Sequence, residues 1–214
     1  MTILRKSKMP IKAVIFDLDG TITQPFFDFD LIRREMGLDK NSGPILETML
    51  NMTPHQHSRA EKILSVYEKR AVTESKLNTG AAHTLRELRR QGIHIGILTR
   101  NKRKNAVGVA EKHGLIFDFI VDREDGPVKP DAFGVLKICR HFAVEARQTL
   151  LVGDYLFDMV CAKAAGAMAV LLTNTEKARD FTQYADFTIE RIDQILQIVE
   201  EKNRTEPSDT TEAE

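Results

Sequence analysis

The sequence predicts an α/β protein with a doubly wound parallel sheet and a small, all-helical insertion after the first strand. Short apolar runs bounded by turn residues alternate with helical patterns, several of these runs end at polar residues, and residues 24–78 show helical patterns alone. A chain of 214 residues suffices for one such domain with a small insertion. We therefore expect a core from residues 1–23 and 79–200, an inserted segment at 24–78, and a disordered acidic tail at 201–214.

The composition gives no indication of a strongly charged partner. The 31 basic and 31 acidic residues cancel, so no net field favours nucleic acid or an anionic membrane. No signal peptide or span of transmembrane length is recognisable. Cys139 and Cys161 fall in amphipathic helical patterns, which predicts buried, reduced thiols. We expect a cytoplasmic protein that binds neither nucleic acid nor membrane, and the sequence does not predict its oligomeric state.

The first predicted strand is the apolar run Ala13–Phe16, which stops abruptly at Asp17 and Asp19. Ligands of open parallel sheets bind beyond the carboxyl ends of the strands, so chemistry is expected here. Side chains alternate along a strand, so both carboxylates leave it on the same side, and Gly20 permits a tight turn whose N–H groups can face an anion. Two carboxylates repel a phosphate unless a cation intervenes, which suggests an oxygen-ligated ion such as magnesium. Alone, the pair is equally consistent with a surface turn or helix cap.

Three helices are expected in the inserted segment. Asp28 or Asp30 can cap the first helix, and a short second helix covers about 44–50. The dipeptide Thr53-Pro54 supplies an N-cap and a first-turn proline for a long third helix to about Leu77.

Two groups of polar side chains in this segment are candidates for a substrate or metal contact. His55 and His57 are two residues apart and do not share a helical face, so we interpret them as solvated. Arg33, Arg34 and Arg59 either form a charged outer face or meet an anionic substrate, and the sequence does not choose between these.

The parallel pattern resumes after Gly80. A helix is expected over 81–91 and a buried strand over 93–98, which ends at Thr99. The hydroxyl of Thr99 is a candidate N-cap for the next helix, over 102–113.

A third strand over 117–121 leads to the dipeptide Lys129-Pro130. Proline suits the first turn of a helix, and a lysine beside it would direct its ammonium toward the sheet edge. This pattern favours an anion at that edge.

The fourth strand, over 149–152, is followed by Asp154 and Asp158. If a helix begins at once, these side chains, four apart, lie on one face. Clustered negative charge is costly, and a divalent cation removes that cost. A fifth strand over 169–172, a sixth over 186–189 and a final helix over 191–200 complete the predicted core.

The polar residues at the strand ends occur in an order that resembles the four motifs of the haloacid dehalogenase superfamily of phosphotransferases. The first motif is Asp17-Leu18-Asp19-Gly20-Thr21, and the others follow as Thr99, Lys129, and Asp154 with Asp158. The resemblance extends from about Ile11 to Glu200. It implies a Rossmann-like core in which the helical insertion is a mobile cap over the site.

The resemblance also implies a role for each of these residues. Asp17 would attack phosphorus and form an aspartyl-phosphate, while Asp19 would protonate the departing alcohol and later activate water. Phosphate binding is implied for Gly20, Thr99, Arg100 and Lys129. Mg²⁺ is implied as the cofactor, held by Asp17, the carbonyl of Asp19 and Asp154, with Asp158 in support.

Within the superfamily, the segments Leu98–Asn101 and Asn78–Gly80 look most like phosphoglycolate-phosphatase-type enzymes. This implies a magnesium-dependent phosphatase whose partner is a small organic phosphate monoester. A dehalogenase is disfavoured, because the acid at position 19 serves a phosphoryl leaving group and has no evident use in displacing halide. A sugar phosphomutase stays open as an alternative, although its first motif commonly carries a further acid where this chain has Thr23-Gln24-Pro25.

Two further alternatives stay open. Phosphonate hydrolysis would need a cap lysine that forms a Schiff base, for which Lys62, Lys69 and Lys76 are candidates. A binding or regulatory module that kept the fold but lost turnover is the alternative outside the enzymes. The intact set of acids, threonine and lysine at the strand ends argues against that module.

Overall fold

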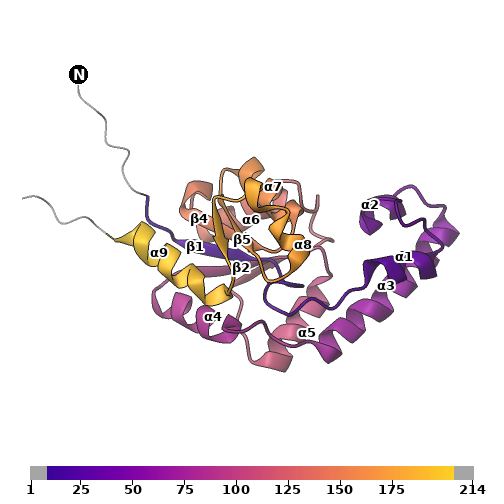
Figure 1. Ribbon diagram of the computed structural model, residues 1–214, viewed down its shortest axis with the longest axis horizontal. Coiled ribbons are helices and arrows are strands. Elements are labelled where there is room, and N and C mark those ends of the chain that lie inside the picture. Colours follow the sequence, from indigo (N-terminus) through magenta and orange to yellow (C-terminus); the bar gives the residue numbers. More distant parts are fainter. Residues whose placement is uncertain (1–8, 205–214) are drawn as a thin grey trace, which may run out of the picture.

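The computed structural model describes residues 9–204, and its centre is a six-stranded sheet (Figure 1). All neighbouring strands are parallel and the strand order is β3-β2-β1-β4-β5-β6. The strands are β1 (Ala13–Phe16), β2 (His94–Leu98), β3 (Phe119–Val121), β4 (Thr149–Gly153), β5 (Met168–Leu172) and β6 (Phe187–Ile189). This topology confirms the predicted doubly wound α/β class.

Helices cover both faces of the sheet. One face carries α4 (Ala81–Arg90), α5 (Arg103–His113) and α9 (Ile195–Asn203), and the other carries α6 (Phe133–Phe142) and α7 (Leu156–Ala165) (Figure 1). The short helix α8 (Glu176–Arg179) follows β5, and single 3₁₀ turns occupy Ala146–Gln148, Thr182–Tyr184 and Ile192–Gln194. The side chains of β1 alternate between the two faces. Val14 and Phe16 belong to the apolar cluster that contains residues of α4, α5 and α9, whereas Ile15 belongs to the cluster that contains residues of α6 and α7. A strand covered on both faces is continuously apolar.

The position of β1 determines where a ligand can bind. It lies between β2 and β4, and the chain winds outward from it in both directions. At such a switch point the connections after neighbouring strands diverge and leave a crevice beyond the carboxyl ends. The loops after β1, β2 and β4 therefore meet at one edge.

The inserted segment forms α1 (Phe29–Met36), α2 (Ile45–Met49) and α3 (Pro54–Glu74), which lie together at one end of the molecule (Figure 1). The side chain of Asp28 caps α1, as one of the two predicted candidates, and Thr53 and Gln56 form a capping box at α3. The three helices share a small apolar cluster of their own, formed by Ile32, Ile45, Met49, Ala60, Leu64 and Tyr67.

The junctions of the inserted segment are joined by polar contacts. Nδ2 of Asn78 donates to the carbonyls of Gly20, Thr21 and Thr23 at 2.9, 2.8 and 3.1 Å. Thr23 and Leu77 also form an isolated antiparallel bridge. The chain segment that enters the insertion, near Thr23, and the segment that leaves it, at residues 77–78, are thus held side by side. We place the boundaries of the insertion at these segments.

Several helix boundaries differ from the sequence prediction, and the final helix, α9, begins at Ile195 instead of near Arg191. Helix α3 ends at Glu74 instead of near Leu77, because Leu77 pairs with Thr23. Pro130 is not in the first turn of a helix: residues 129–132 form a turn, and α6 begins at Phe133, whose N–H is bound by Oδ1 of Asp131 at 2.7 Å.

The predicted disordered tail begins too early. Helix α9 continues through Asn203, whose Oδ1 accepts from the N–H of Ile11 at 2.6 Å and whose Nδ2 donates to the Ile11 carbonyl at 3.1 Å. These hydrogen bonds tie residues 201–203 to the start of the core. Residues 205–214 of the predicted tail lie outside the described residues.

The thiols of Cys139 and Cys161 are both buried and free, as predicted. Each lies in a helix that packs on the same face of the sheet. Within residues 9–204, no helix combines the length and the apolar character needed to cross a bilayer.

Candidate active site

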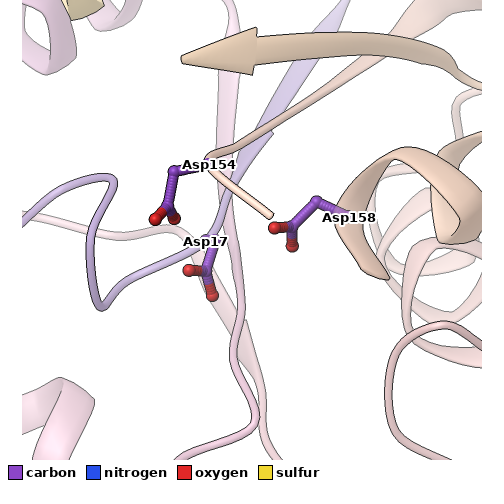
Figure 2. A group of neighbouring side chains, drawn as sticks. All are labelled: Asp17, Asp154 and Asp158. Atoms are coloured by element: carbon purple, nitrogen blue, oxygen red, sulfur yellow. The ribbon is translucent and has the colours of Figure 1, made fainter. Parts of the chain in front are cut away.

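Three carboxylates converge at the carboxyl edge of the sheet. Asp17 follows β1, Asp154 follows β4, and Asp158 lies in the first turn of α7, and each offers an oxygen within 4.8 Å of the others (Figure 2). The structure therefore brings together the acids of the first and fourth motifs. The prediction that Asp154 and Asp158 share one face of a helix was wrong, because α7 begins only at Leu156 and Asp154 precedes it. Its carboxylate reaches the site from the end of the strand.

Two glycines make room for these carboxylates. Gly20 has a φ of +97°, and a Cβ at this position would overlap the carboxylate of Asp154. A Cβ at Gly153 would overlap the carboxyl group of Asp158. The hydroxyl of Thr21 donates to Oδ1 of Asp154 at 3.0 Å. A glycine is therefore needed at position 20 for two reasons: the positive φ of the turn and the closeness of the Asp154 carboxylate.

Lys129 is the counter-charge of this cluster. Its Nζ lies 2.6 Å from Oδ1 of Asp17 and 2.6 Å from Oδ1 of Asp158, and its side chain is 3% exposed. Burial alone would lower the pKa of Lys129, but the charges of Asp158 and Asp17 outweigh it and hold the pKa above its ordinary value. One ammonium accordingly faces three acids, and a surplus of negative charge remains.

Burial and the charge of neighbouring acids raise the pKa values of Asp154 and Asp158. Burial, followed by the charge of Asp17, raises the pKa of Asp154 to about 8. Burial likewise raises the pKa of Asp158 to about 6, although Lys129 opposes the change. Buried carboxylates whose pKa values are raised favour a further cation, and a donor set made only of carboxylate oxygens fits a hard ion such as magnesium.

Asp19 lies beside this group, with its carboxylate outside the set of three. Nδ2 of Asn101 donates to Oδ2 of Asp19 at 3.2 Å. Burial, followed by the charge of Asp17, raises the pKa of Asp19 to about 7. A carboxyl group with this pKa can both give and take a proton near neutral pH.

Thr99 is buried at the end of β2 and its hydroxyl accepts from the N–H of Asn101 at 3.0 Å. The hydroxyl hydrogen is thus directed elsewhere and can serve an anion. Thr99 is not the cap of the next helix, contrary to the prediction. Helix α5 begins at Arg103, whose N–H is bound by Oδ2 of Asp122 at 2.6 Å, from the loop after β3.

Arg100 contacts the inserted segment. Its Nη2 donates to Oε2 of Glu47 in α2 at 2.6 Å, its Nη1 donates to the carbonyl of Lys129, and its guanidinium lies 4.8 Å above the ring of Phe157. The contact with Glu47 joins the loop after β2 to the insertion, and the other two hold Arg100 to the core. That Arg100 binds phosphate stays a prediction.

A cavity of about 740 Å³ separates the sheet edge from the inserted helices. Its floor contains the acids and Lys129, and its walls include aromatic side chains: Phe27 and Phe29 come from the insertion and Tyr155 and Phe157 from the core. All the predicted site residues except Gly20 line this cavity, namely Asp17, Asp19, Thr99, Arg100, Lys129, Asp154 and Asp158.

The lining of the cavity shows which polar residues of the inserted segment lie at the site. Of the three arginines considered, Arg33 lines it, and Arg34 and Arg59 do not. Neither histidine of α3 reaches it, which agrees with their interpretation as solvated. The lysines proposed for a Schiff base, Lys62, Lys69 and Lys76, are also absent from its lining, so the geometry gives the phosphonate alternative no support.

Sequence reasoning missed a buried polar group beside the site. Glu68 of α3, 3% exposed, pairs with Arg123 of the loop after β3, and both line the cavity. Burial raises the pKa of Glu68 although Arg123 opposes the change. Its spacing from Leu64 and Ala71, which face inward on α3, was the available signal: a charged residue on a helix's apolar stripe needs a buried partner.

Comparisons with known proteins identify the family of the chain. A family model described as haloacid dehalogenase-like hydrolase matches residues 27–172, a stretch that contains Thr99, Lys129, Asp154 and Asp158. A haloacid dehalogenase-like hydrolase domain-containing protein of Arabidopsis thaliana is 30% identical over 210 residues, or 91% of this chain and 86% of that protein. A phosphoglycolate phosphatase of Thiobacillus denitrificans is 27% identical over 76% of this chain and 83% of its own.

A solved structure shows the same fold. The crystal structure of a hydrolase from Pseudomonas syringae superposes with a TM-score of 0.75 at 20% identity, over 89% of this chain and 98% of that one. The match to the family model and the similarity to the Arabidopsis protein both extend over most of the chain. The chain therefore belongs to the haloacid dehalogenase-like hydrolase family of enzymes.

Proposed function

We propose that this enzyme is a magnesium-dependent phosphatase that hydrolyses small organic phosphate monoesters through an aspartyl-phosphate on Asp17. The convergence of Asp17, Asp154 and Asp158 around the single ammonium of Lys129 carries the proposal. A phosphate dianion can enter such a site only if further positive charge offsets the acids. The similarity to a phosphoglycolate phosphatase supports this class of reaction.

The proposed metal ligands are the carboxylates of Asp17 and Asp154 and the backbone carbonyl of Asp19, with Asp158 in support. The three acids come from different elements yet their oxygens lie within 4.8 Å of one another, which supports a shared ion. When bound, magnesium would neutralise charge on the phosphoryl oxygens.

The residues divide the chemistry between two steps. In the first, an oxygen of Asp17 attacks phosphorus, the bond from phosphorus to the alcohol oxygen breaks, and Asp19 gives its proton to that oxygen. In the second, water attacks phosphorus, its proton passes to Asp19, and the carboxylate of Asp17 is released together with inorganic phosphate. Thr99 and Lys129, with N–H groups after Gly20, would bind the phosphoryl oxygens in both steps.

The aromatic side chains on the cavity walls favour an alcohol with apolar surface. Phe27, Phe29, Tyr155 and Phe157 line the space beyond the acids. Arg100, on the same wall, is already paired with Glu47. We therefore propose organic leaving groups that pack against aromatic rings, and the physiological substrate is to be sought among such monoesters.

Release of phosphate from p-nitrophenyl phosphate tests the proposed function. We expect turnover with Mg²⁺, loss of turnover in excess chelator, and recovery when Mg²⁺ is restored. A panel of alkyl, sugar, aryl and nucleoside monophosphates would then rank the alcohols. Full turnover in excess chelator would contradict the shared ion. Movement of phosphate between two hydroxyls of a sugar, without release, would indicate a phosphomutase instead.

The location of the enzyme is also a proposal. Buried, unpaired thiols suit a reducing compartment, and both cysteines are of this kind. We therefore propose the cytoplasm, which fractionation of cells and immunodetection would test.

A further inference from the structure

The carboxylate of Asp19 is held by a side chain that none of the four motifs includes. Nδ2 of Asn101 donates to Oδ2 of Asp19 at 3.2 Å, and Asn101 is 5% exposed. A hydrogen bond to one carboxylate oxygen restricts rotation of the group, and thereby fixes where its second oxygen faces. An acid that must deliver a proton to one atom of a substrate depends on such orientation.

The amide of Asn101 is oriented by donors on its other side. The backbone N–H of Lys102 donates to Oδ1 of Asn101 at 2.8 Å, and Nδ2 of Asn105 donates to the same oxygen at 2.7 Å. A backbone N–H can only donate, so the amide oxygen must face it. The amide nitrogen of Asn101 is therefore turned toward Asp19.

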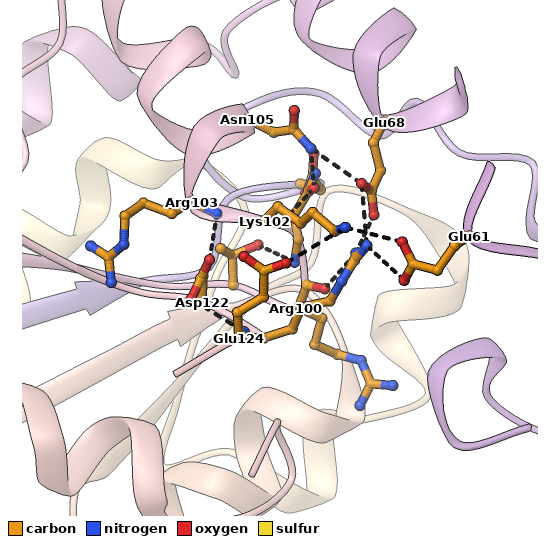
Figure 3. Close-up of polar contacts among 12 residues, drawn as sticks. Glu61, Glu68, Arg100, Lys102, Arg103, Asn105, Asp122 and Glu124 are labelled. Atoms are coloured by element: carbon orange, nitrogen blue, oxygen red, sulfur yellow. Dashed lines mark hydrogen bonds and ion pairs between the residues drawn. The ribbon is translucent and has the colours of Figure 1, made fainter. Parts of the chain in front are cut away.

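Glu68 extends this chain of hydrogen bonds into the inserted helix α3. Its Oε2 accepts from Nδ2 of Asn105 at 3.2 Å, and Figure 3 shows the side chains of Glu68 and Asn105 pointing toward each other. Its carboxylate also pairs with Arg123, whose side chain is 7% exposed. Because a carboxylate only accepts hydrogen bonds, the amide of Asn105 must turn its nitrogen toward Glu68. The same nitrogen donates to Oδ1 of Asn101, so Glu68 also helps to orient the amide of Asn101.

These groups have little freedom to rearrange. Glu68, Asn101 and Asn105 are 3%, 5% and 7% exposed, so water cannot readily replace a lost partner. A polar chain this deeply buried stays in one arrangement only while each link is satisfied.

We propose that Asn101 is a positioning residue for proton donation by Asp19, and that it is held by Asn105 of α5, which is held in turn by Glu68 of the inserted helix α3. The proposal rests on the proposed phosphatase function. It also predicts an order of importance. The N–H of Lys102 holds Asn101 without help from the insertion, so loss of Asn101 should matter more than loss of Glu68.

The test compares two aryl esters of similar size in the full-length enzyme with Mg²⁺. Nitrophenolate leaves without protonation, whereas phenolate gains from a positioned acid, and kcat/KM covers the steps up to departure of the alcohol. Asn101→Ala should lower kcat/KM for phenyl phosphate roughly tenfold or more beyond its effect on p-nitrophenyl phosphate. Glu68→Gln should shift the same ratio in the same direction by a smaller factor.

Glu61→Gln is the matched control. Glu61 also joins α3 to the core, through Lys102 at 3.0 Å (Figure 3) and through Arg123 at 3.6 Å, but it has no hydrogen bond to Asn101 or Asn105. Its substitution should change kcat/KM for the two esters by the same factor. Asn101→Ser provides a second variant if Asn101→Ala fails to fold, because a serine hydroxyl is too short to reach Asp19.

A double-mutant cycle completes the test. In the Asp19→Asn background, the substitution of Asn101 should cause no further change in the ratio of the two esters, because the group that it positions is gone. Equal loss with both esters in the folded Asn101 variants, or a full additional loss in the Asp19→Asn background, would overturn the positioning role. Failure of the wild-type enzyme to hydrolyse either ester with Mg²⁺ would instead contradict the proposed function, and the positioning role with it.

Discussion

The ammonium nitrogen of Lys129 lies 2.6 Å from Oδ1 of Asp17, a residue 112 positions earlier in the chain. The loop after β3 thus delivers the only ammonium within hydrogen-bond reach of the proposed nucleophile among the described residues. The contact places a positive charge where a phosphoryl group would bind. It also restrains the carboxylate of Asp17 before substrate binds.

Replacement of this lysine tests its role. Lys129→Met keeps the length of the side chain and removes the charge, so stabilisation of the developing phosphoryl charge is lost. We expect kcat/KM for p-nitrophenyl phosphate to fall roughly 10²-fold or more. The concentration of Mg²⁺ needed for half-maximal activity should also fall, because the acids lose their competing counter-charge. Lys129→Arg is the control that retains the charge, and normal activity in Lys129→Met would show that the ammonium has no part in turnover.

The acid Asp19 should give the reaction a characteristic pH dependence. Burial and the charge of Asp17 raise its pKa to about 7, so the protonated form that donates prevails below this pH and disappears above it. For phenyl phosphate, kcat/KM should fall roughly tenfold per pH unit above neutrality. The fall should be shallower for p-nitrophenyl phosphate and absent in Asp19→Asn, which also corrects for ionisation of the substrate. Identical profiles for both esters and both proteins would exclude Asp19 as the donor.

Substitution of Arg100 shows whether this residue binds phosphate or instead contacts the insertion on the alcohol side of the cavity. Its guanidinium is held by Glu47 and stacks over Phe157, so Arg100→Met should act on the alcohol side of the cavity. We expect KM for aryl esters to rise roughly three- to tenfold, while inhibition by inorganic phosphate stays unchanged. Glu47→Gln should reproduce part of the effect. A weaker inhibition by inorganic phosphate in Arg100→Met would instead support the prediction from the sequence that Arg100 binds the phosphoryl group.

Much of the fold could be predicted because its signals are local. The strands are apolar on both faces, so β1 and β4 are legible as continuous runs, and the caps at Asp28 and Thr53 are chemically specific. Asp17 and Asp154 could be predicted equally well, since each follows the end of a strand. These two acids converge because β1 and β4 are neighbours in the sheet, and the first turn of α7 adds Asp158.

The parts that could not be predicted depend on contacts between distant segments. Asp122, from the loop after β3, caps α5 in place of Thr99, and Ile11 holds the end of α9 in place as far as Asn203. The pairing of Glu68 with Arg123 links an inserted helix to a core loop 55 residues away. Neither local propensity nor helical periodicity contains this information.

The central claim is that phosphorus becomes covalently bound to Asp17, and mass measurement of rapidly quenched enzyme tests it most directly. In Asp19→Asn, attack on p-nitrophenyl phosphate remains possible while the base for the second step is missing. We predict a burst of nitrophenolate, with one phosphoryl group on the intact protein that peptide mapping assigns to Asp17, and no such adduct in Asp17→Asn. Absence of any covalent phosphate, together with equal slowing of alkyl and p-nitrophenyl esters in Asp19→Asn, would contradict the claim and indicate direct attack by water.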